Sequence, residues 1–222
     1  MTTTRAHTFR FAAVAALLAA LLPGCGRGVP ESARAEPAPR PLTAALPAEE
    51  QQMGAEDEEM NRRPLKLPLT EPKIVVSKRA RRLVLYSAGR PVRAYRVVLG
   101  FAPEGDKVEQ GDGRTPEGAF YVCMKNERSR FYLSLGLSYP DEEDAARGLR
   151  DGLITRAQHD RIARAIRRKL TPPWNTRLGG EIFIHGGGTA SDWTAGCVAL
   201  ENEHIKELFD SVPLGTAVVI NP

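Results

Sequence analysis

The sequence predicts a mainly β domain with a few helices, in which a sandwich-like pair of sheets carries an inserted helical segment at about 141–170. Two observations support this prediction. A series of short apolar and β-branched segments, separated by turn residues, begins at Lys73, and one stretch of helical periodicity interrupts the series. About 150 residues follow Glu71, without an internal repeat, which is enough for one domain with a complete hydrophobic core.

The predicted strands are short and follow one another closely. They cover residues 74–76, 82–86, 92–99, 120–124, 131–137, 181–184 and 216–220. The segment 100–118 is long and rich in glycine, so a phosphate-binding loop is an alternative interpretation for it. It lacks the Gly-Lys-Ser/Thr ending and the following helix of such a loop, and we therefore interpret it as a turn-rich connection.

The helical insertion has its clearest signal at Thr155, which forms a capping-box pattern with Gln158. Apolar residues then recur at helical spacing: Ile162, Ile166 and Leu170. Basic residues cover the other faces: Arg161, Arg164, Arg167, Arg168 and Lys169. We interpret them as a solvated face, and the functional alternative is a basic lid over an anionic, carboxylate-rich substrate. A second helix is predicted over 203–209, with Asn202 as its N-cap.

The N-terminus has the composition of an export signal. A basic start with Arg5 and Arg10 precedes an apolar stretch, 11–22, that is too short to span a membrane but suits a signal peptide. Removal of residues 1–24 lowers the formal net charge from +4 to +2, because both arginines and no acidic residue are lost. The small charge and the lack of a basic cluster with interleaved aromatic residues argue against a nucleic-acid partner.

The predicted signal peptide ends in Leu22-Pro-Gly-Cys25, which resembles the lipobox of bacterial lipoproteins except at Pro23. The resemblance implies that Cys25 is lipidated and anchors the exported chain in the cell envelope. Gly26 after it favours the outer membrane, if the organism has one. The alternative is an ordinary signal peptide with an incidental cysteine. Residues 25–70 are predicted to form a disordered tether rich in Pro, Ala and Glu, with a reach of roughly 35–40 Å, before a folded domain at 71–222.

The segment 181–202 contains the two side chains best suited to nucleophilic catalysis at neutral pH. His185 ends an apolar, strand-like run, and Cys197 follows a glycine ahead of the second predicted helix. A free thiol is only slightly ionised at neutral pH and needs an activating base, for which His185 is the candidate.

Three glycines and one acid complete this candidate site. Gly186 and Gly187 permit a tight turn that leaves backbone N–H groups accessible to a ligand. Gly196 would let a substrate carbonyl approach the N–H groups of residues 196 and 197, which could form an oxyanion hole. Either Asp192 or a backbone carbonyl is expected to orient the imidazole, and the sequence leaves both open.

Several alternatives compete with catalysis. Cys197 could be a structural buried thiol and His185 a satisfied core histidine. The two could also bind zinc with His204, although no Cys-x-x-Cys or His-x-x-x-His spacing supports a metal site. A papain-like arrangement is disfavoured because there the cysteine precedes the histidine. His204 is expected to be exposed, and no cofactor is expected. Cys123 is predicted to be a small buried residue, with a disulfide to Cys197 as the minor alternative.

These residues resemble the active-site signature of the YkuD-type L,D-transpeptidases: a His-Gly on a strand, a loop, then Ser/Thr-x-Gly-Cys and an aliphatic residue before a helix. His185 matches the catalytic histidine of that family, Thr194 its Ser/Thr, Gly196 its glycine and Cys197 its nucleophile. The resemblance spans most of 72–222 and implies an L,D-transpeptidase-like β-sandwich that needs no metal.

Further segments resemble the family, and two positions depart from it. Thr115-Pro-Glu-Gly-Ala-Phe120 resembles its Thr-Pro-x-Gly-x-aromatic element, and Asp192-Trp193-Thr194 resembles a subgroup described as YafK-like. The chain has Ala195 where many members have His, and Ala199 where many have Arg. These departures concern how substrate is held and what resolves the intermediate.

The resemblance implies that Cys197 attacks the carbonyl of an L-centre beside a D-amino acid in a peptidoglycan stem peptide and forms a thioester. Attack by an amine gives a cross-link or attaches a lipoprotein. Attack by water gives an L,D-carboxypeptidase, or an amidase that releases a peptidoglycan-linked lipoprotein. A non-catalytic wall-binding lipoprotein is the third reading, motivated by Ala195 and Ala199.

Overall fold

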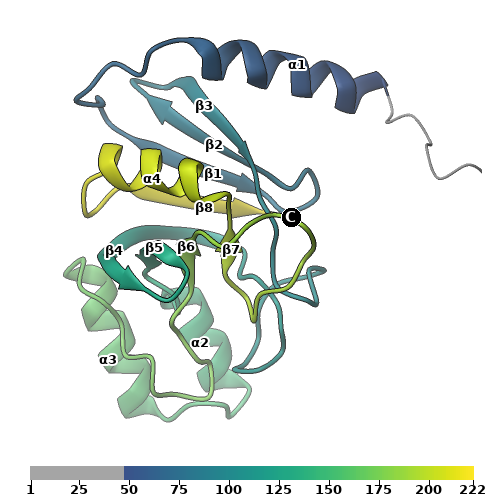
Figure 1. The fold of residues 1–222 in the computed structure, drawn as a ribbon. Helices are drawn as coiled ribbons and strands as arrows, with labels where there is room; N and C mark the ends of the chain where they lie inside the picture. The colour runs from purple at the N-terminus through teal and green to yellow at the C-terminus, as the bar shows by residue number, and fades with distance from the viewer. Residues whose placement is uncertain (1–47) are drawn as a thin grey trace, which may run out of the picture. The chain divides into compact units, whose positions relative to one another are not determined.

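The computed structural model of the 222-residue chain describes residues 48–222. The predicted signal peptide, the predicted lipidation site Cys25 and the first part of the predicted tether lie outside these residues. Within them, eight strands and four helices form the domain shown in Figure 1. None of these helices is long and apolar enough to cross a membrane.

The strands form one series of hydrogen-bonded neighbours in the order β3-β2-β1-β8-β4-β5-β6-β7. Their bounds are β1 Lys73–Ser77, β2 Arg82–Ser87, β3 Arg90–Arg96, β4 Gly118–Ser129, β5 Tyr132–Leu137, β6 Phe183–His185, β7 Val198–Ala199 and β8 Ala217–Asn221. The pairs β1–β8 and β6–β7 are parallel, and the remaining pairs are antiparallel. The mainly β prediction is confirmed.

The long strand β4 joins the two halves of the sheet. Its first part, 118–121, pairs with β8, and its second part pairs with β5, with a register shift between Val122 and Met124. An irregularity of this kind bends a strand and increases its twist. The sheet therefore curls into a half-barrel, and the predicted pair of sheets corresponds to its two halves (Figure 1).

The curled sheet and helix α4 (Asn202–Ser211) enclose the main hydrophobic core. Alternate residues of β1, Ile74 and Val76, are fully buried, as the period of two in a strand requires. Helix α4 contributes residues at helical spacing, namely Ile205, Leu208 and Phe209. This core holds β6 between β5 and β7 in the sheet, and α4 packs against β5 and β6.

The helical insertion is confirmed as α2 (Glu142–Arg150) and α3 (Arg156–Arg167), which lie between β5 and β6. The predicted capping box is present, because Gln158 N donates to Thr155 Oγ1 at 3.2 Å and Thr155 N donates to Gln158 Oε1 at 2.8 Å. The two helices bury a second, smaller cluster: Ala145, Ile154, Ile162 and Leu178. Helix α3 ends before Leu170, which is exposed instead of lying on its apolar face.

Helix α1 (Ala48–Arg62) lies where the sequence analysis expects a disordered tether. The Asp57 carboxylate pairs with the Arg82 guanidinium at 2.5 Å, and the Asn61 amide forms two hydrogen bonds with the backbone of Ala94, at 2.7 and 3.0 Å. Ala94 lies on the edge strand β3, so Asn61 satisfies groups that an edge leaves unpaired. The prediction of disorder rested on the low apolar content of this segment. It was wrong for 48–62, because the contacts that order the helix are polar and their partners are distant in sequence.

Candidate active site

His185 and Cys197 come from neighbouring strands. His185 is the last residue of β6, and Cys197 immediately precedes β7, which pairs in parallel with β6. The register places Cys197 level with Phe183. Because side chains alternate along a strand, Phe183, His185 and Cys197 project to one face, and all three line a single cavity, whereas Ile184 is buried in the core.

The imidazole of His185 is held in one orientation. Its Nδ1 lies 2.6 Å from the carbonyl oxygen of Gly186, and a carbonyl only accepts, so Nδ1 carries the proton and Nε2 is an acceptor. The ring stacks on Phe131 with centroids 4.6 Å apart, and Trp193 meets it edge-on at 5.5 Å. Burial lowers the pKa of His185 below its usual 6.5. The ring is therefore neutral at neutral pH, the form that a general base needs.

The thiol of Cys197 is protonated at rest. Burial raises the pKa of this thiol above its usual 9.0, against the opposing effects of the Phe183 N–H and the charge of Lys107. Sγ accepts a hydrogen bond from Phe183 N at 3.4 Å and donates one to Glu181 O at 3.6 Å. None of the hydrogen bonds within the described residues joins Sγ to the His185 ring. The thiol thus contacts the backbone of Phe183 and Glu181 and lines the same cavity as the His185 ring.

A short turn fixes the backbone at Cys197. Thr194 Oγ1 donates to Cys197 O at 2.8 Å and accepts from Gly196 N at 3.1 Å. Gly196 has φ +132°, and a Cβ at this position would lie 2.7 Å from Arg114 O. The expectation that Gly196 leaves room for a substrate is therefore corrected: the chain itself fills that space and its N–H is already bonded. The N–H of Cys197 has no acceptor among the described residues.

The expectation for Gly186 and Gly187 is corrected in the same way. Gly186 N donates to Leu133 O at 3.3 Å, and Gly187 N donates to Asn202 Oδ1 at 3.0 Å, so neither N–H group is left for a ligand. Asn202 is the first residue of α4 and not its N-cap, which is Glu201. The Asn202 side chain instead holds the glycine turn that follows His185.

Asp192 anchors the loop before the nucleophile and does not orient the imidazole. Its carboxylate pairs with Arg81, with Nη2 and Oδ2 2.7 Å apart, and accepts from Leu99 N at 2.8 Å. The sequence left two candidates to orient the imidazole, Asp192 and a backbone carbonyl. In the structure the backbone carbonyl of Gly186 orients it. Trp193 lies directly on the site, where its ring contacts His185 and lines the cavity.

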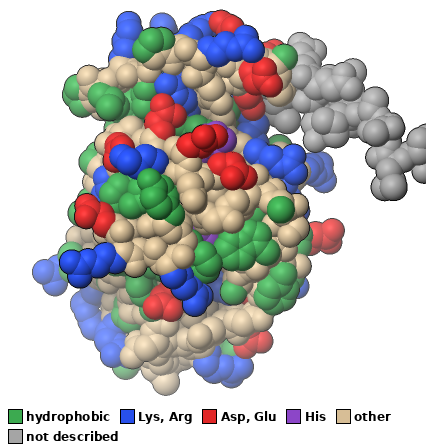
Figure 2. Space-filling view, viewed as in Figure 1, with side chains coloured by type: hydrophobic (Ala, Val, Ile, Leu, Met, Phe, Trp, Pro, Cys, Tyr) green, Lys and Arg blue, Asp and Glu red, His purple; other side chains and the backbone are tan. Residues whose placement is uncertain are grey.

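The cavity beside these residues has a volume of about 890 Å³. Three basic residues line it, Lys107, Arg128 and Arg130, together with one acidic residue, Glu181. No residue of α3 does, so the cavity offers no support for the basic lid. Figure 2 shows Lys and Arg side chains on the molecular surface over the region of α2 and α3, as the solvated-face interpretation expects.

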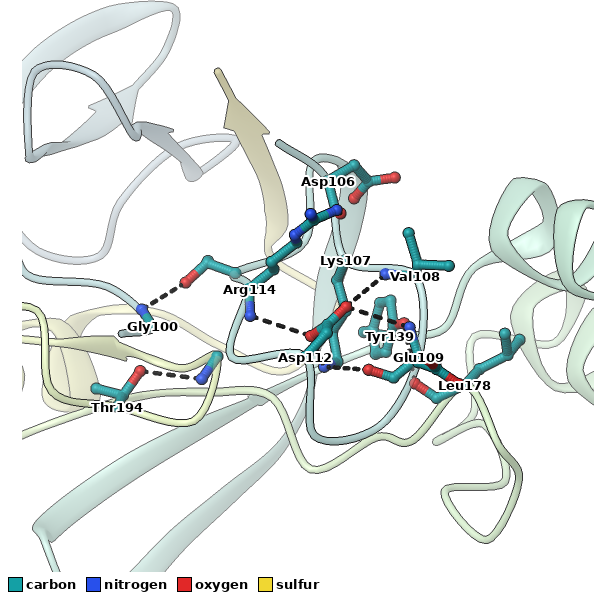
Figure 3. Close-up of polar contacts among 12 residues, drawn as sticks. Gly100, Asp106, Lys107, Val108, Glu109, Asp112, Arg114, Tyr139, Leu178 and Thr194 are labelled. Carbon is teal, nitrogen blue, oxygen red and sulfur yellow. Dashed lines mark hydrogen bonds and ion pairs between the residues drawn. The ribbon is translucent and has the colours of Figure 1, made fainter. Parts of the chain in front are cut away.

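The loop between β3 and β4 supports the cavity wall through a network of polar contacts (Figure 3). The Asp112 carboxylate accepts from the N–H groups of Val108, Glu109 and Arg114 and pairs with Lys107 Nζ at 2.8 Å. These bonds and its ion pair lower the pKa of Asp112 despite the opposing effect of burial. The glycine-rich segment is thus a structural scaffold that brings the buried Lys107 to the cavity.

The other candidate residues, Cys123 and His204, do not line the cavity. Cys123 and Cys197 are both free, and burial raises the pKa of Cys123 on β4. His204 packs against Tyr95 with ring centroids 4.9 Å apart, so it is half-buried instead of exposed. Within residues 48–222, no three His, Cys, Asp or Glu side chains are grouped to hold a metal ion.

Five residues of the site were not anticipated: Lys107, Arg128, Arg130, Phe131 and Glu181. Phe131 carries the Arg130 guanidinium on its ring, 4.8 Å from the centroid, and stacks on His185 as well. No local pattern marks the first four, because they reach the cavity from the loop between β3 and β4 and from the β4–β5 hairpin. Glu181 alone had a signal, since it follows Gly179-Gly180 and immediately precedes the strand that carries the histidine.

The fold and the site together define a domain with a thiol and an imidazole in a cavity large enough for a peptide. The chain matches the YkuD L,D-transpeptidase catalytic domain over residues 71–220, and it belongs to that family. Comparison with curated proteins gives no match.

Three solved structures illustrate the likeness. An L,D-transpeptidase (residues 123–326) from Xylanimonas cellulosilytica DSM 15894 is 18% identical, with a TM-score of 0.41 over 77% of this chain and 69% of that one. The helical cell shape determining protein Pgp2 (K307A mutant) from Campylobacter jejuni is 19% identical, with 0.49 over 77% and 53%. Bdellovibrio bacteriovorus Bd1075 is 19% identical, with 0.46 over 68% and 48%. The chain thus spans about half the length of the latter two.

Proposed function

We propose that this protein is a cysteine L,D-transpeptidase that acts on peptidoglycan stem peptides, with Cys197 as nucleophile and His185 as base. The observation that carries the proposal is that adjacent parallel strands place both side chains on the wall of one cavity of about 890 Å³. Membership of the L,D-transpeptidase family supports the reaction class.

In the proposed acylation, the Cys197 thiol turns from Glu181 O towards His185 and transfers its proton to Nε2. The sulfur then forms a bond to the carbonyl carbon of an L-centre, and the oxyanion accepts the free N–H of Cys197. As the intermediate collapses, the C–N bond to the following D-residue breaks. The imidazolium returns its proton to the leaving amine, so a thioester and a neutral base remain.

The charges of the cavity suit such a substrate. Arg128 and Arg130 have no ion-pair partner among the described residues, and both line the cavity near His185. Stem peptides carry free carboxylates, which guanidinium groups bind by charge-assisted hydrogen bonds. The same acyl-enzyme gives hydrolysis if water attacks it, so transfer and hydrolysis differ only in the second step.

The test is incubation of the purified domain with tetrapeptide muropeptides, followed by mass spectrometry of protein and products. The wild type should form a thioester on Cys197 and new muropeptides, and Cys197→Ala should form neither. Cys123→Ala is the matched control, because it removes the other free thiol of the domain and should react like the wild type. Equal turnover by Cys197→Ala would exclude the mechanism, and no reaction by any variant would favour a wall-binding role.

We also propose that export and lipidation at Cys25 hold the enzyme beside the cell wall. The support is the sequence pattern that ends at Cys25. A Cys25→Ser variant expressed with its own signal should leave the membrane fraction. Equal membrane association of the variant would exclude the anchor without affecting the proposed reaction.

A further inference from the structure

The cavity is lined by one acidic residue, whose backbone contacts the proposed nucleophile. Glu181 lines the cavity, and its backbone carbonyl accepts the Cys197 thiol hydrogen bond at 3.6 Å. Its side chain is exposed, and none of the ion pairs within the described residues includes it. Glu181 thus presents an exposed carboxylate without an ion-pair partner among the described residues, on the cavity wall that also carries Cys197.

Glu181 holds a backbone conformation that a residue with a Cβ disfavours. Its φ is +54°, in the left-handed region where glycine is at ease. Two glycines precede it, and Gly179 also has a positive φ of +81°. A glycine at 181 would follow this path without a steric penalty. A strained residue that persists beside reacting groups points to a use for its side chain.

The Glu181 carboxylate also makes ionisation of the Cys197 thiol less favourable in the free enzyme. A negative charge beside the sulfur disfavours the thiolate, and Glu181 acts in this direction on Cys197. Lys107, the buried cation of the cavity, favours the thiolate, but it is already paired with Asp112 at 2.8 Å and leaves the Glu181 carboxylate without a cationic partner. A cation supplied by a ligand would both pair with Glu181 and remove this penalty.

We propose that Glu181 binds the ammonium group of the acyl acceptor and thereby favours transfer to an amine over hydrolysis. The inference rests on the proposed function, and it names the group that guides the second substrate to the thioester. Arg128 and Arg130 line the same cavity and suit the carboxylates of a peptide. Among the described residues that line it, Glu181 is the one acidic side chain, and it suits the amine.

The step balances with the groups present. The bound ammonium loses one proton to His185 Nε2 and becomes a nucleophilic amine. Its nitrogen forms a bond to the thioester carbonyl carbon, the C–S bond breaks, and the sulfur leaves as a thiolate. The second nitrogen proton goes to that thiolate, the imidazolium releases its proton to water, and an amide and a free thiol remain.

The test separates acylation from its resolution. The acyl-enzyme of each variant is prepared with a tetrapeptide donor, freed from excess donor by rapid gel filtration, and followed by intact-protein mass spectrometry. It is then challenged with a disaccharide tetrapeptide bearing a free side-chain amine, with hydroxylamine, which is uncharged at neutral pH, or with water alone.

In Glu181→Gln the half-saturating concentration of the peptide amine should rise by about tenfold, the size expected for loss of a charge-assisted contact. Resolution by hydroxylamine and by water should show no comparable loss, because neither carries the cation that Glu181 binds. Glu127→Gln is the matched control, since it removes an exposed carboxylate from β4 that does not line the cavity, and it should behave as the wild type. Equal half-saturation in Glu181→Gln and wild type, or no acceleration by the peptide amine in the wild type, overturns the inference. Failure of the proposed function would show itself earlier, as the lack of a thioester on Cys197.

Discussion

Thr194 and Cys197 are joined by a hydrogen bond of 2.8 Å between the threonine hydroxyl and the cysteine carbonyl. The same hydroxyl accepts the N–H of Gly196 at 3.1 Å, so it closes the turn on both sides of the reactive residue. Thr194 is buried, and both hydrogen bonds of its Oγ1 are to backbone groups. The Ser/Thr of the family signature therefore has a positioning role in this chain.

Replacing Thr194 tests this relationship. Thr194→Val keeps the shape but leaves the buried Gly196 N–H without a partner, and Cys197 O keeps only the 3.4 Å hydrogen bond from Thr115 Oγ1. The free energy of unfolding should therefore fall by about 1–3 kcal/mol. Misplacement of the sulfur should slow thioester formation by about tenfold or more. Thr194→Ser keeps the hydroxyl and should restore most of both properties, measured by denaturant unfolding and intact-mass acylation.

The pH dependence of acylation should be that of a neutral thiol–imidazole pair. The pKa of His185 lies below 6.5 and that of Cys197 above 9.0, so both groups are uncharged between these values. The rate of thioester formation should rise with pH through a value below 6.5 and then stay level to about pH 8. A rate that keeps increasing by about tenfold per pH unit across this range would instead indicate attack by a free thiolate without a base.

Burial of His185 also links stability to pH. The folded state binds the imidazole proton less readily than the unfolded state, whose pKa is near 6.5. Its contribution to stability is therefore complete above 6.5 and is lost as the pH falls through the folded pKa. His185→Gln should show a shallower decrease of Tm between neutral and mildly acidic pH than the wild type, and parallel curves would argue against a buried neutral ring.

The sequence predicted the helical insertion, the thiol–imidazole pair and every strand except the two-residue β7, because each of these has a local signal. Alternating apolar residues mark β1, the capping box marks Thr155, and strand-end His185 and glycine-flanked Cys197 mark the site. Helix α1 could not be predicted in this way, because Asn61 and Asp57 are ordered by partners on β2 and β3.

Within the site, too, the residues with a local signal were predicted, and the contacts made by distant partners were not. Gly186 and Gly187 were recognised as turn residues, but their N–H groups bond Leu133 O and Asn202 Oδ1, which are distant in sequence and which a local pattern does not reveal. Phe131 and Lys107 reach the cavity only because β4, β5 and the preceding loop fold over β6. Contacts between residues distant in sequence thus determine which backbone N–H groups of the glycine turn are available to a ligand.

Asp192 should behave as a loop anchor. Asp192→Ala removes the ion pair with Arg81 and the acceptor of Leu99 N–H, and should lower the free energy of unfolding by about 1–3 kcal/mol. Acylation should slow because the loop carries Thr194 and Cys197, but the pH at which it rises should not move. A shift of that pH in Asp192→Ala, absent from Arg81→Met, would show that the carboxylate acts on His185 after all.

Gly196 should tolerate no side chain, for two separable reasons. Its φ of +132° is unfavourable for any residue with a Cβ, and the added atom would lie 2.7 Å from Arg114 O. Gly215 has a positive φ of +85° with no atom within 4 Å of a built Cβ, so Gly215→Ala carries the backbone cost alone. Gly196→Ala should therefore cost about 2 kcal/mol more than Gly215→Ala in denaturant unfolding and should abolish acylation, because Cys197 must move with it. Equal losses of stability in the two variants would mean that the Arg114 carbonyl yields, and that the close packing of the nucleophile turn is not what fixes the sulfur.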